Sequence, residues 1–273
     1  QILYFDFVRF FIEMLLDKII ILDQISNNNK YKLFTKYSDY TLRVDNDYTK
    51  FANDIGHLNS EFQWFLFRLL AGSKSKIKIR YKNVFYYKNL YKQAINTFSF
   101  LKIIFSKKKN KPKIYYKHSL KRFNSIKGID IIDSNFPNLI LNFNLSIKNK
   151  SLRNSIAQIF EKTISKNFKY LKINKKSLKI YSHIFSILLR NEIIEDAKIN
   201  KKKYELFFNK RRVRYFLGTG PQSFSSIEQN FFAVECLERK IPIITFQHGG
   251  MIGYEKSMPQ YCAPMIFSNI FIH

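Results

Sequence analysis

The sequence holds few of the residues that form disulfides, bind metals or mark secretion. It contains only two cysteines, Cys236 and Cys262, and their spacing fits neither a disulfide framework nor a set of metal ligands. No zinc or calcium loop pattern occurs, and no Gly-x-Ser-x-Gly element supplies a nucleophile for Ser/His/Asp catalysis. No secretory signal is evident. We therefore expect a cytoplasmic protein that needs no metal and no cofactor.

Acidic residues are also scarce. The 20 Asp and Glu residues face 47 Lys and Arg residues, which gives a formal net charge of +27. Such a field suits an anionic partner, whether nucleic acid, an acidic membrane or a phosphorylated substrate. An AT-rich genome would produce the same excess, because it over-supplies Lys, Asn, Ile, Phe and Tyr. The lysines are scattered through every segment and no recognition motif accompanies them, which disfavours nucleic acid as the partner.

No long apolar run is free of charges. Residues 2–22 are strongly apolar, but Asp6, Arg9, Glu13 and Asp17 recur at spacings of three and four. These residues form one polar stripe along a helix, whereas a membrane-spanning helix would carry few or no charges. Two interpretations stay open: a mostly buried helix, or a helix that lies on a membrane surface.

The chain is long and apolar enough for a sizeable core, with 273 residues of which 46% are hydrophobic. Periodicity predicts further elements before residue 200, in an α-rich N-terminal region. The predicted helices span residues 61–70, 151–171 and 177–194, and the predicted strands span 76–82, 113–117 and 138–145. The run 107–113 (KKKNKPK) is interpreted as a basic loop. The apolar residues of the second of these helices lie at helical spacing: Leu152, Ile156, Ile159, Phe160, Ile164, Phe168 and Leu171.

The C-terminal quarter predicts a strand–loop–helix–strand unit within residues 213–250. A strand over 213–217 is followed by an apolar helix and by a second strand over 241–246. A crossover this short implies parallel strands and a right-handed connection. The loops 218–223 and 247–254 should therefore emerge at the same sheet edge. The predicted fold class is α/β, with a Rossmann-like parallel sheet flanked by helices.

The second loop carries the most conspicuous polar cluster. Gln247, His248, Gly249 and Gly250 follow directly after the strand, where open α/β sheets bind their ligands. The imidazole of His248 can act as a general base or donate to a phosphate, which makes it the candidate catalytic residue. Gln247 could orient a sugar or phosphate oxygen, and the glycines could bring backbone amides close to an anion. A purely structural histidine is the competing interpretation.

The first loop contains Gly218, Thr219 and Gly220, which match part of a dinucleotide-binding fingerprint. Position 223 is Ser rather than the third glycine, and no acidic residue ends the following strand, so we reject a nicotinamide site. A strand-to-helix turn that needs glycine is one interpretation. A loop that presents Thr219, Gln222 or Ser223 to a substrate is the other.

Two more polar residues lie just past the second loop's glycines. Tyr254 and Glu255 are candidate substrate-binding residues. Glu255 is either a catalytic acid or base, or a solvated loop carboxylate. The other histidines have no motif around them and are interpreted as structural or surface residues.

The run 230–254 (NFFAVECLERKIPIITFQHGGMIGY) resembles bacterial surface-carbohydrate and capsule-type transferases of the two-domain GT-B glycosyltransferase architecture. In that family a strand ends in Gln-His-Gly or Gln-His-Gly-Gly, often with Tyr-Gly or Gly-Tyr shortly after. Residues 265–273 (MIFSNIFIH) resemble the strand that leads out of the first domain. The resemblance covers about 60 residues, roughly 213–273.

The resemblance implies that residues 1–273 are an incomplete N-terminal, acceptor-side domain of a longer protein. A donor-binding domain would follow, His248 would face the cleft between the domains, and the chain alone would be inactive. The implied partners are a nucleotide-sugar donor, a glycan or lipid-linked acceptor and the anionic inner face of the membrane.

The resemblance leaves several functions open. The leading one is a transferase of surface-polysaccharide biosynthesis that moves a sugar from a nucleotide-activated donor to a glycan. A nucleotide-sugar epimerase or hydrolase and a glycerophosphate-type transferase are the alternatives among enzymes. A basic nucleic-acid-binding protein or a membrane-associated scaffold is the alternative outside enzymes.

Overall fold

The computed structural model groups the chain into two compact units, which are described separately. The helical unit comprises Phe7–Val84 and Asn144–Asn191, and the sheet unit comprises Gln1–Asp6, Phe85–Phe143 and Glu192–His273. That both belong to one incomplete domain stays a prediction. The structure describes residues 5–26, 39–44, 60–71, 76–81, 98, 101–102, 104–105, 109–116, 130–132, 139, 149–171, 173–189, 191–219, 227–247 and 266–272.

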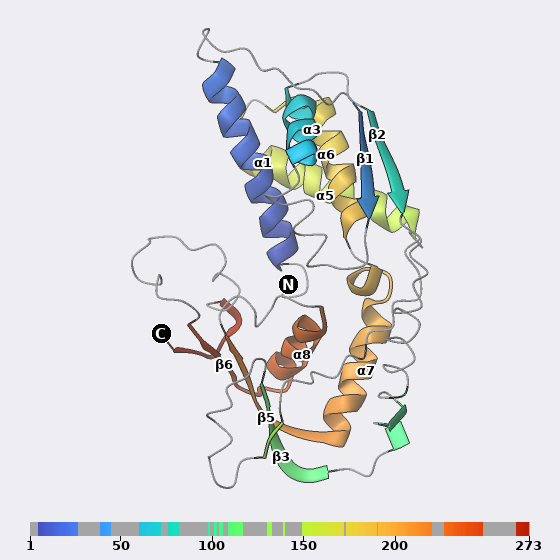
Figure 1. Ribbon diagram of the computed structural model, residues 1–273, viewed down its shortest axis with the longest axis vertical. Helices are drawn as coiled ribbons and strands as arrows, with labels where there is room; N and C mark the ends of the chain where they lie inside the picture. Colours follow the sequence, from blue (N-terminus) through green and yellow to red (C-terminus); the bar gives the residue numbers. More distant parts are fainter. Residues whose placement is uncertain are drawn as a thin grey trace. The chain divides into compact units, whose positions relative to one another are not determined.

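The helical unit contains four described helices and a pair of parallel strands (Figure 1). The helices are α1 (Phe5–Ser26), α3 (Ser60–Leu70), α5 (Lys150–Asn167) and α6 (Lys175–Leu188). The strands are β1 (Asp39–Val44) and β2 (Lys76–Tyr81). The predicted helices at 2–22 and 61–70 and the strand at 76–82 are confirmed, whereas β1 was not predicted.

Helix α6 contacts the other three described helices of this unit, and two of its side chains donate hydrogen bonds to α1 and α3. The buried hydroxyl of Tyr181 donates to the carbonyl of Phe11 in α1 at 2.7 Å. The hydroxyl of Ser177 donates to the carbonyl of Leu69 in α3 at 2.6 Å. A buried hydroxyl needs a hydrogen-bond partner, so these two bonds specify which helices pack against α6 and how closely they approach it.

Helix α1 buries one face and solvates the other. Phe11 and Leu15 are fully buried, while Glu13 and Asp17 of the predicted polar stripe are exposed. Arg9 pairs with Glu13 at 3.2 Å, one helical turn away. The interpretation of a mostly buried helix with one polar stripe therefore fits.

Within the described segments, every helix is either too short or too polar to cross a lipid bilayer.

The apolar face predicted for α5 is confirmed at Phe160 and Ile164, which are buried, but not along its whole length. Arg153, Ala157, Phe160 and Ile164 are the buried positions, whereas Ile159 is 65% exposed, and Leu152 of the predicted face is exposed too. Phe160 stacks on Phe185 of α6 with ring centroids 4.1 Å apart, which fixes the rotation of the helix. Helix α6 also ends at Leu188, earlier than the predicted residue 194.

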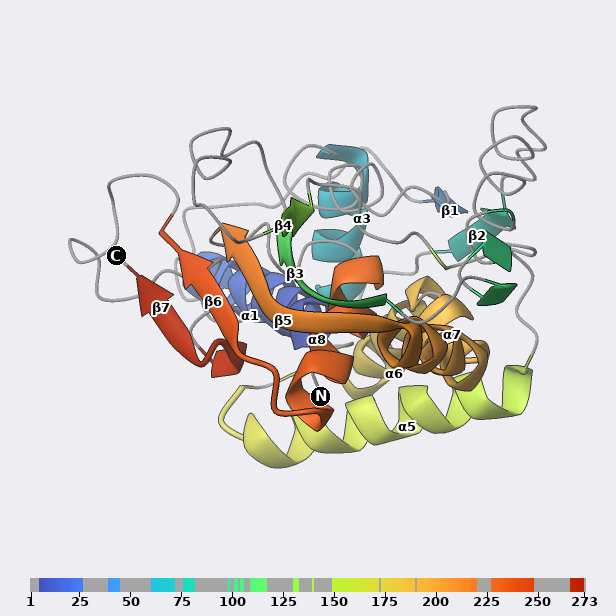
Figure 2. The same cartoon turned by 90° about the horizontal axis from the view of Figure 1, so that it is seen from below.

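The sheet unit is built on five parallel strands in the order β4-β3-β5-β6-β7 (Figure 2). The strands are β3 (Lys109–Tyr116), β4 (Asp130–Ile132), β5 (Arg211–Thr219), β6 (Ile243–Phe246) and β7 (Ile270–Ile272). The described helices of this unit are η2 (Asn191–Ile193, which begins at its boundary), α7 (Ala197–Lys210) and α8 (Ile227–Glu238). The predicted α/β class with a parallel sheet flanked by helices is confirmed.

Helices α7 and α8 pack on one face of this sheet. Phe232 of α8 contacts Phe207 and Phe208 of α7 and Phe216 of β5, with ring centroids 4.7 to 6.1 Å apart. The connection from β4 to β5 and the connection from β5 to β6 both run toward the β7 edge of the sheet. Because both are right-handed crossovers, their helices lie on the same face. The aromatic core between α7, α8 and β5 is the result.

Strand β3 corrects the prediction of a basic loop at 107–113. Its first half is basic, but residues 109–113 lie in the strand, and 113–116 confirm the predicted strand. Pro112 falls where the register between β3 and β5 shifts, and the pairing of β3 with β4 begins only at Lys113. A proline has no N–H to donate, so it is tolerated at such an irregularity. Of the predicted strand 138–145, the structure describes only Leu139, which is buried.

Candidate functional site

The β5–α8–β6 unit brings the first residues of the two candidate loops to one sheet edge, as predicted. Strands β5 and β6 are parallel, with Gly218 opposite Thr245 and Thr219 opposite Phe246. Both strands therefore end at the same level, on neighbouring positions about 4.8 Å apart. The chain leaves them side by side at the carboxyl edge of the sheet.

The turn from α8 into β6 is a Schellman motif. The N–H of Ile241 donates to the carbonyl of Cys236 at 2.8 Å, and the N–H of Lys240 donates to that of Leu237 at 3.2 Å. Lys240 has φ 55°, the left-handed conformation that such a helix end requires and that glycine usually supplies. Pro242 follows and prevents the helix from continuing, so the chain enters β6 at once.

Strand β6 is held on its other side by β7. Thr245 is fully buried, and its hydroxyl lies 2.8 Å from that of Ser268. The N–H of Gln247 donates to the carbonyl of Ile272 at 2.7 Å, so Gln247 is still paired with β7 where it leaves the sheet. The strand expected within 265–273 is confirmed for Ile270–Ile272.

The structure describes three of the predicted site residues. Gly218 and Thr219 are the last two residues of β5, and Gln247 is the first residue after β6. Gly218 is buried and Gln247 is half-buried. The other predicted site residues lie outside the described residues, and their roles stay predictions: His248, Gly249, Gly250, Gly220, Ser223, Tyr254 and Glu255.

The strand order adds a position that the sequence did not reveal. The chain passes from β3 to β4 on one side and then to β5 on the other, so the strand order reverses between β3 and β5. Ligands of open α/β sheets bind outside the carboxyl ends of the strands at such a reversal. Tyr116, the last residue of β3, lies opposite Leu217 at this point. The end of β5 at Gly218 and Thr219 is therefore closer to the reversal than the end of β6, although the sequence signal after β5 is the weaker one.

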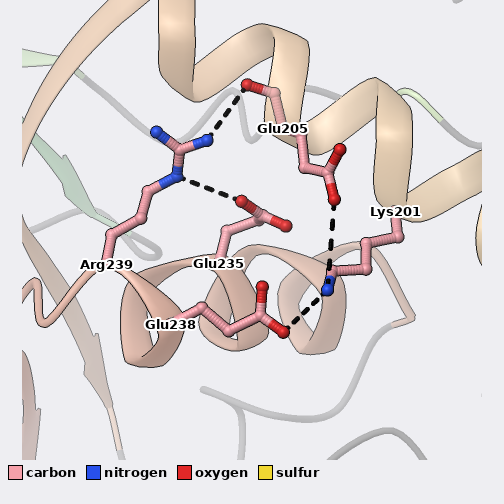
Figure 3. A network of polar contacts seen from close by, with 5 residues as sticks. All are labelled: Lys201, Glu205, Glu235, Glu238 and Arg239. Atoms are coloured by element: carbon pink, nitrogen blue, oxygen red, sulfur yellow. Dashed lines mark hydrogen bonds and ion pairs between the residues drawn. The ribbon is translucent and has the colours of Figure 1, made fainter.

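A cluster of charged side chains joins α7 to α8 (Figure 3). Arg239 donates to the carboxylate of Glu235 at 3.1 Å and to the backbone carbonyl of Glu205 at 3.3 Å. Lys201 pairs with Glu238 at 2.7 Å and with Glu205 at 3.9 Å. The hydrogen bond from Lys201 to Glu238 raises the pKa of that lysine.

Glu235 is the buried member of this cluster. Its side chain is 2% exposed, and its Oε1 accepts no hydrogen bond from the described residues. Burial raises the pKa of Glu235, and the nearby Arg239 guanidinium opposes the rise. The cluster lies at the carboxyl half of α8, which leads into the amino end of β6. It therefore positions the helix at the sheet edge opposite to the one where the candidate loops emerge.

No group of three or more His, Cys, Asp or Glu residues in the described ranges could hold a metal ion. Comparison of the chain with protein-family models, with curated proteins and with solved structures found no match. The α/β fold and the common edge of β5 and β6 are therefore the observations on which a function can be argued.

Proposed function

We propose that the protein is a transferase that moves a sugar or a related group from a nucleotide-activated donor to a glycan, and that this chain contributes its acceptor side. One observation carries the proposal: β5 and β6 end in register at one carboxyl edge. The Gln-His-Gly-Gly run begins at that edge with Gln247, where α/β folds keep their ligands. The resemblance of residues 230–254 to GT-B surface-carbohydrate transferases supports the same reading.

The chemistry assigns a role to each residue of the loops. The acceptor hydroxyl attacks the anomeric carbon, the bond from that carbon to the diphosphate oxygen breaks, and His248 accepts the hydroxyl proton. Gln247 orients the sugar, while Gly249 and Gly250 present backbone amides to the departing diphosphate. Thr219 and Ser223 contact the substrate from the first loop. Positive groups and helix amino ends stabilise the leaving group, so the reaction needs no metal.

The test is a transfer assay on the full-length protein, because the resemblance predicts a donor-binding domain after residue 273. Labelled UDP-, GDP- and CDP-activated sugars are offered with a lipid-linked glycan extract, and both nucleotide release and label in the glycan are measured. His248→Ala should lower turnover by about 10²- to 10⁴-fold, the usual contribution of a general base. His183→Ala is the matched control, since His183 is exposed on α6 in the other unit. Wild-type turnover by His248→Ala would refute the catalytic assignment.

Other outcomes separate the alternatives. Consumption of a nucleotide sugar without label in the glycan indicates an epimerase or hydrolase. Transfer from a nucleotide-activated glycerol phosphate, and from no sugar donor, indicates the glycerophosphate class. Failure to bind any nucleotide donor indicates a scaffold without catalysis.

A further inference from the structure

Helix α7 presents two large aliphatic side chains to solvent. Ile199 is 58% exposed and Leu206 is 43% exposed. They are seven residues apart, so they lie on the same side of the helix about two turns from each other. The opposite side is buried in the sheet unit through Tyr204, Phe207 and Phe208. The aliphatic pair is therefore not part of the hydrophobic core that packs α7 against the rest of the sheet unit.

Lysines surround this aliphatic pair. We define the outer face of α7 by the residues that share this side of the helix: Lys198, Ile199, Lys202, Leu206, Asn209 and Lys210. The single glutamate of α7, Glu205, pairs instead with Lys201 on the side toward α8. Lys203 lies at the edge of this side, where burial lowers its pKa. It donates to Oδ1 of the buried Asn200 at 3.3 Å, so it is not counted with the outer face. The outer face thus combines two aliphatic side chains with three lysines and no acidic residue.

We propose that the outer face of α7 binds the surface of an anionic lipid bilayer. The lysine ammonium groups would reach anionic headgroups while their methylene stems lie along the apolar boundary. Ile199 and Leu206 would enter that boundary, as the apolar side of an interfacial helix does.

Nucleic acid is the weaker choice of partner for this face. Proteins hold single strands with aromatic side chains that stack on bases and with cations along the backbone. The outer face of α7 has no aromatic residue, and exposed aliphatic side chains gain nothing against phosphates. The proposal deepens the proposed function, because a lipid-linked acceptor would be met at such a surface, but its test needs no transfer activity.

Helix α5 provides a matched control within the same chain. Leu152 and Ile159 are also exposed and seven residues apart. Lys162 and Lys166 lie on that side beside the uncharged Ser155 and Thr163, so the aliphatic pair of α5 has two cations around it against three on α7. If exposed aliphatic residues alone caused binding, changes on α5 and α7 would act alike.

The experiment is co-sedimentation of the protein with vesicles of phosphatidylcholine, with or without 30% phosphatidylglycerol. We expect binding to the anionic vesicles alone, weakened by salt. Lys202→Gln/Lys210→Gln should weaken it by about 30-fold, because each basic residue near an anionic leaflet contributes about a fivefold factor. Ile199→Ser/Leu206→Ser should weaken it by at least about tenfold.

The controls make the result decisive. Leu152→Ser/Ile159→Ser should bind within about twofold of wild type, and circular dichroism should show every variant folded. Equal binding to neutral vesicles, or α7 variants that bind like wild type, would overturn the proposal. If the lysine variant loses vesicle binding while the aliphatic variant keeps it, and the lysine variant also loses retention on DNA, the face binds nucleic acid instead. Vesicle binding needs neither donor nor acceptor, so a failed transfer assay with intact vesicle binding counts against the proposed function alone.

Discussion

Replacement of Arg153 by methionine tests the central packing of the helical unit. Arg153 is 2% exposed, and its guanidinium donates to the carbonyls of Ser186 and Leu189 and to Oδ1 of Asn191. These groups lie at the carboxyl end of α6, where a helix leaves carbonyls without backbone partners and where its dipole favours a cation. Methionine keeps the length and apolar character of the stem but has no donor.

The expected loss follows from the hydrogen bonds. A hydrogen bond to a charged group contributes about 1.5–3 kcal/mol net, so the two bonds to carbonyls contribute about 3–6 kcal/mol. Burial of a cation costs free energy in the folded state, and methionine avoids that cost. The net loss of unfolding free energy is therefore smaller than the contribution of the hydrogen bonds. We therefore expect Arg153→Met to lower the free energy of unfolding of the helical unit by about 2–4 kcal/mol.

Urea unfolding followed by tryptophan fluorescence measures this change. Trp64 is the single tryptophan of the chain and lies on α3 in the helical unit, beside Phe67 with ring centroids 5.8 Å apart. Its signal reports this unit, which matters because a chain with two units need not unfold in one step. Arg212→Met, at an exposed position of β5, is the control and should change the transition little. If both variants shift the midpoint equally, the guanidinium does not stabilise α6 and the reasoning fails.

Two further predictions concern α8. Because the pKa of Glu235 is raised in the folded state, the folded protein binds this proton more tightly than the unfolded chain. The contribution of Glu235 to the free energy of unfolding should therefore be present below pH about 4.3 and fall as the pH rises through the raised pKa. Glu235→Gln should remove that fall. If the free energy of unfolding changes by the same amount in both proteins between pH 4 and pH 7, the prediction is contradicted. Lys240→Gly should raise the free energy of unfolding by about 0.5–1 kcal/mol, because glycine adopts φ 55° without steric cost; thermal melting measures the gain, and Lys240→Ala should show none.

The β5–α8–β6 unit could be predicted because its signals are local. The apolar strand runs, the helix between them and the short crossover together determine parallel strands and a common edge. The buried face of α5 could not be predicted in the same way. Arg153 enters the core because the end of a different helix, α6, needs donors there, and Leu152 of the predicted face stays in solvent. Sequence periodicity along one helix contains no information about the end of its neighbour.

The candidate site divides along the same line. The emergence of both loops at one sheet edge was predicted, because it follows from a single short crossover between neighbouring strands. The reversal of strand order between β3 and β5 depends on a pairing of residues about 100 positions apart, such as Tyr116 with Leu217. Pro112 and the lysines around it also led to the prediction of a loop for the first half of β3, residues 109–113. The sheet topology was therefore needed to decide which of the two loops begins nearer to the reversal of strand order. It favours the loop that begins at Gly218 as a ligand site more strongly than the sequence does.

The distribution of glycine connects these observations. Five of the eight glycines lie in the stretches that follow or end β5 and β6, at positions 218, 220, 249, 250 and 253. Where a helix end alone demands a left-handed residue, the chain uses Lys240 and accepts the steric cost. At the end of α8, then, a left-handed position is filled without glycine. The glycines instead gather in the two segments that follow β5 and β6 in the sequence. The proposed transferase would need glycine there for a different reason, because backbone without a side chain can approach a bound group closely.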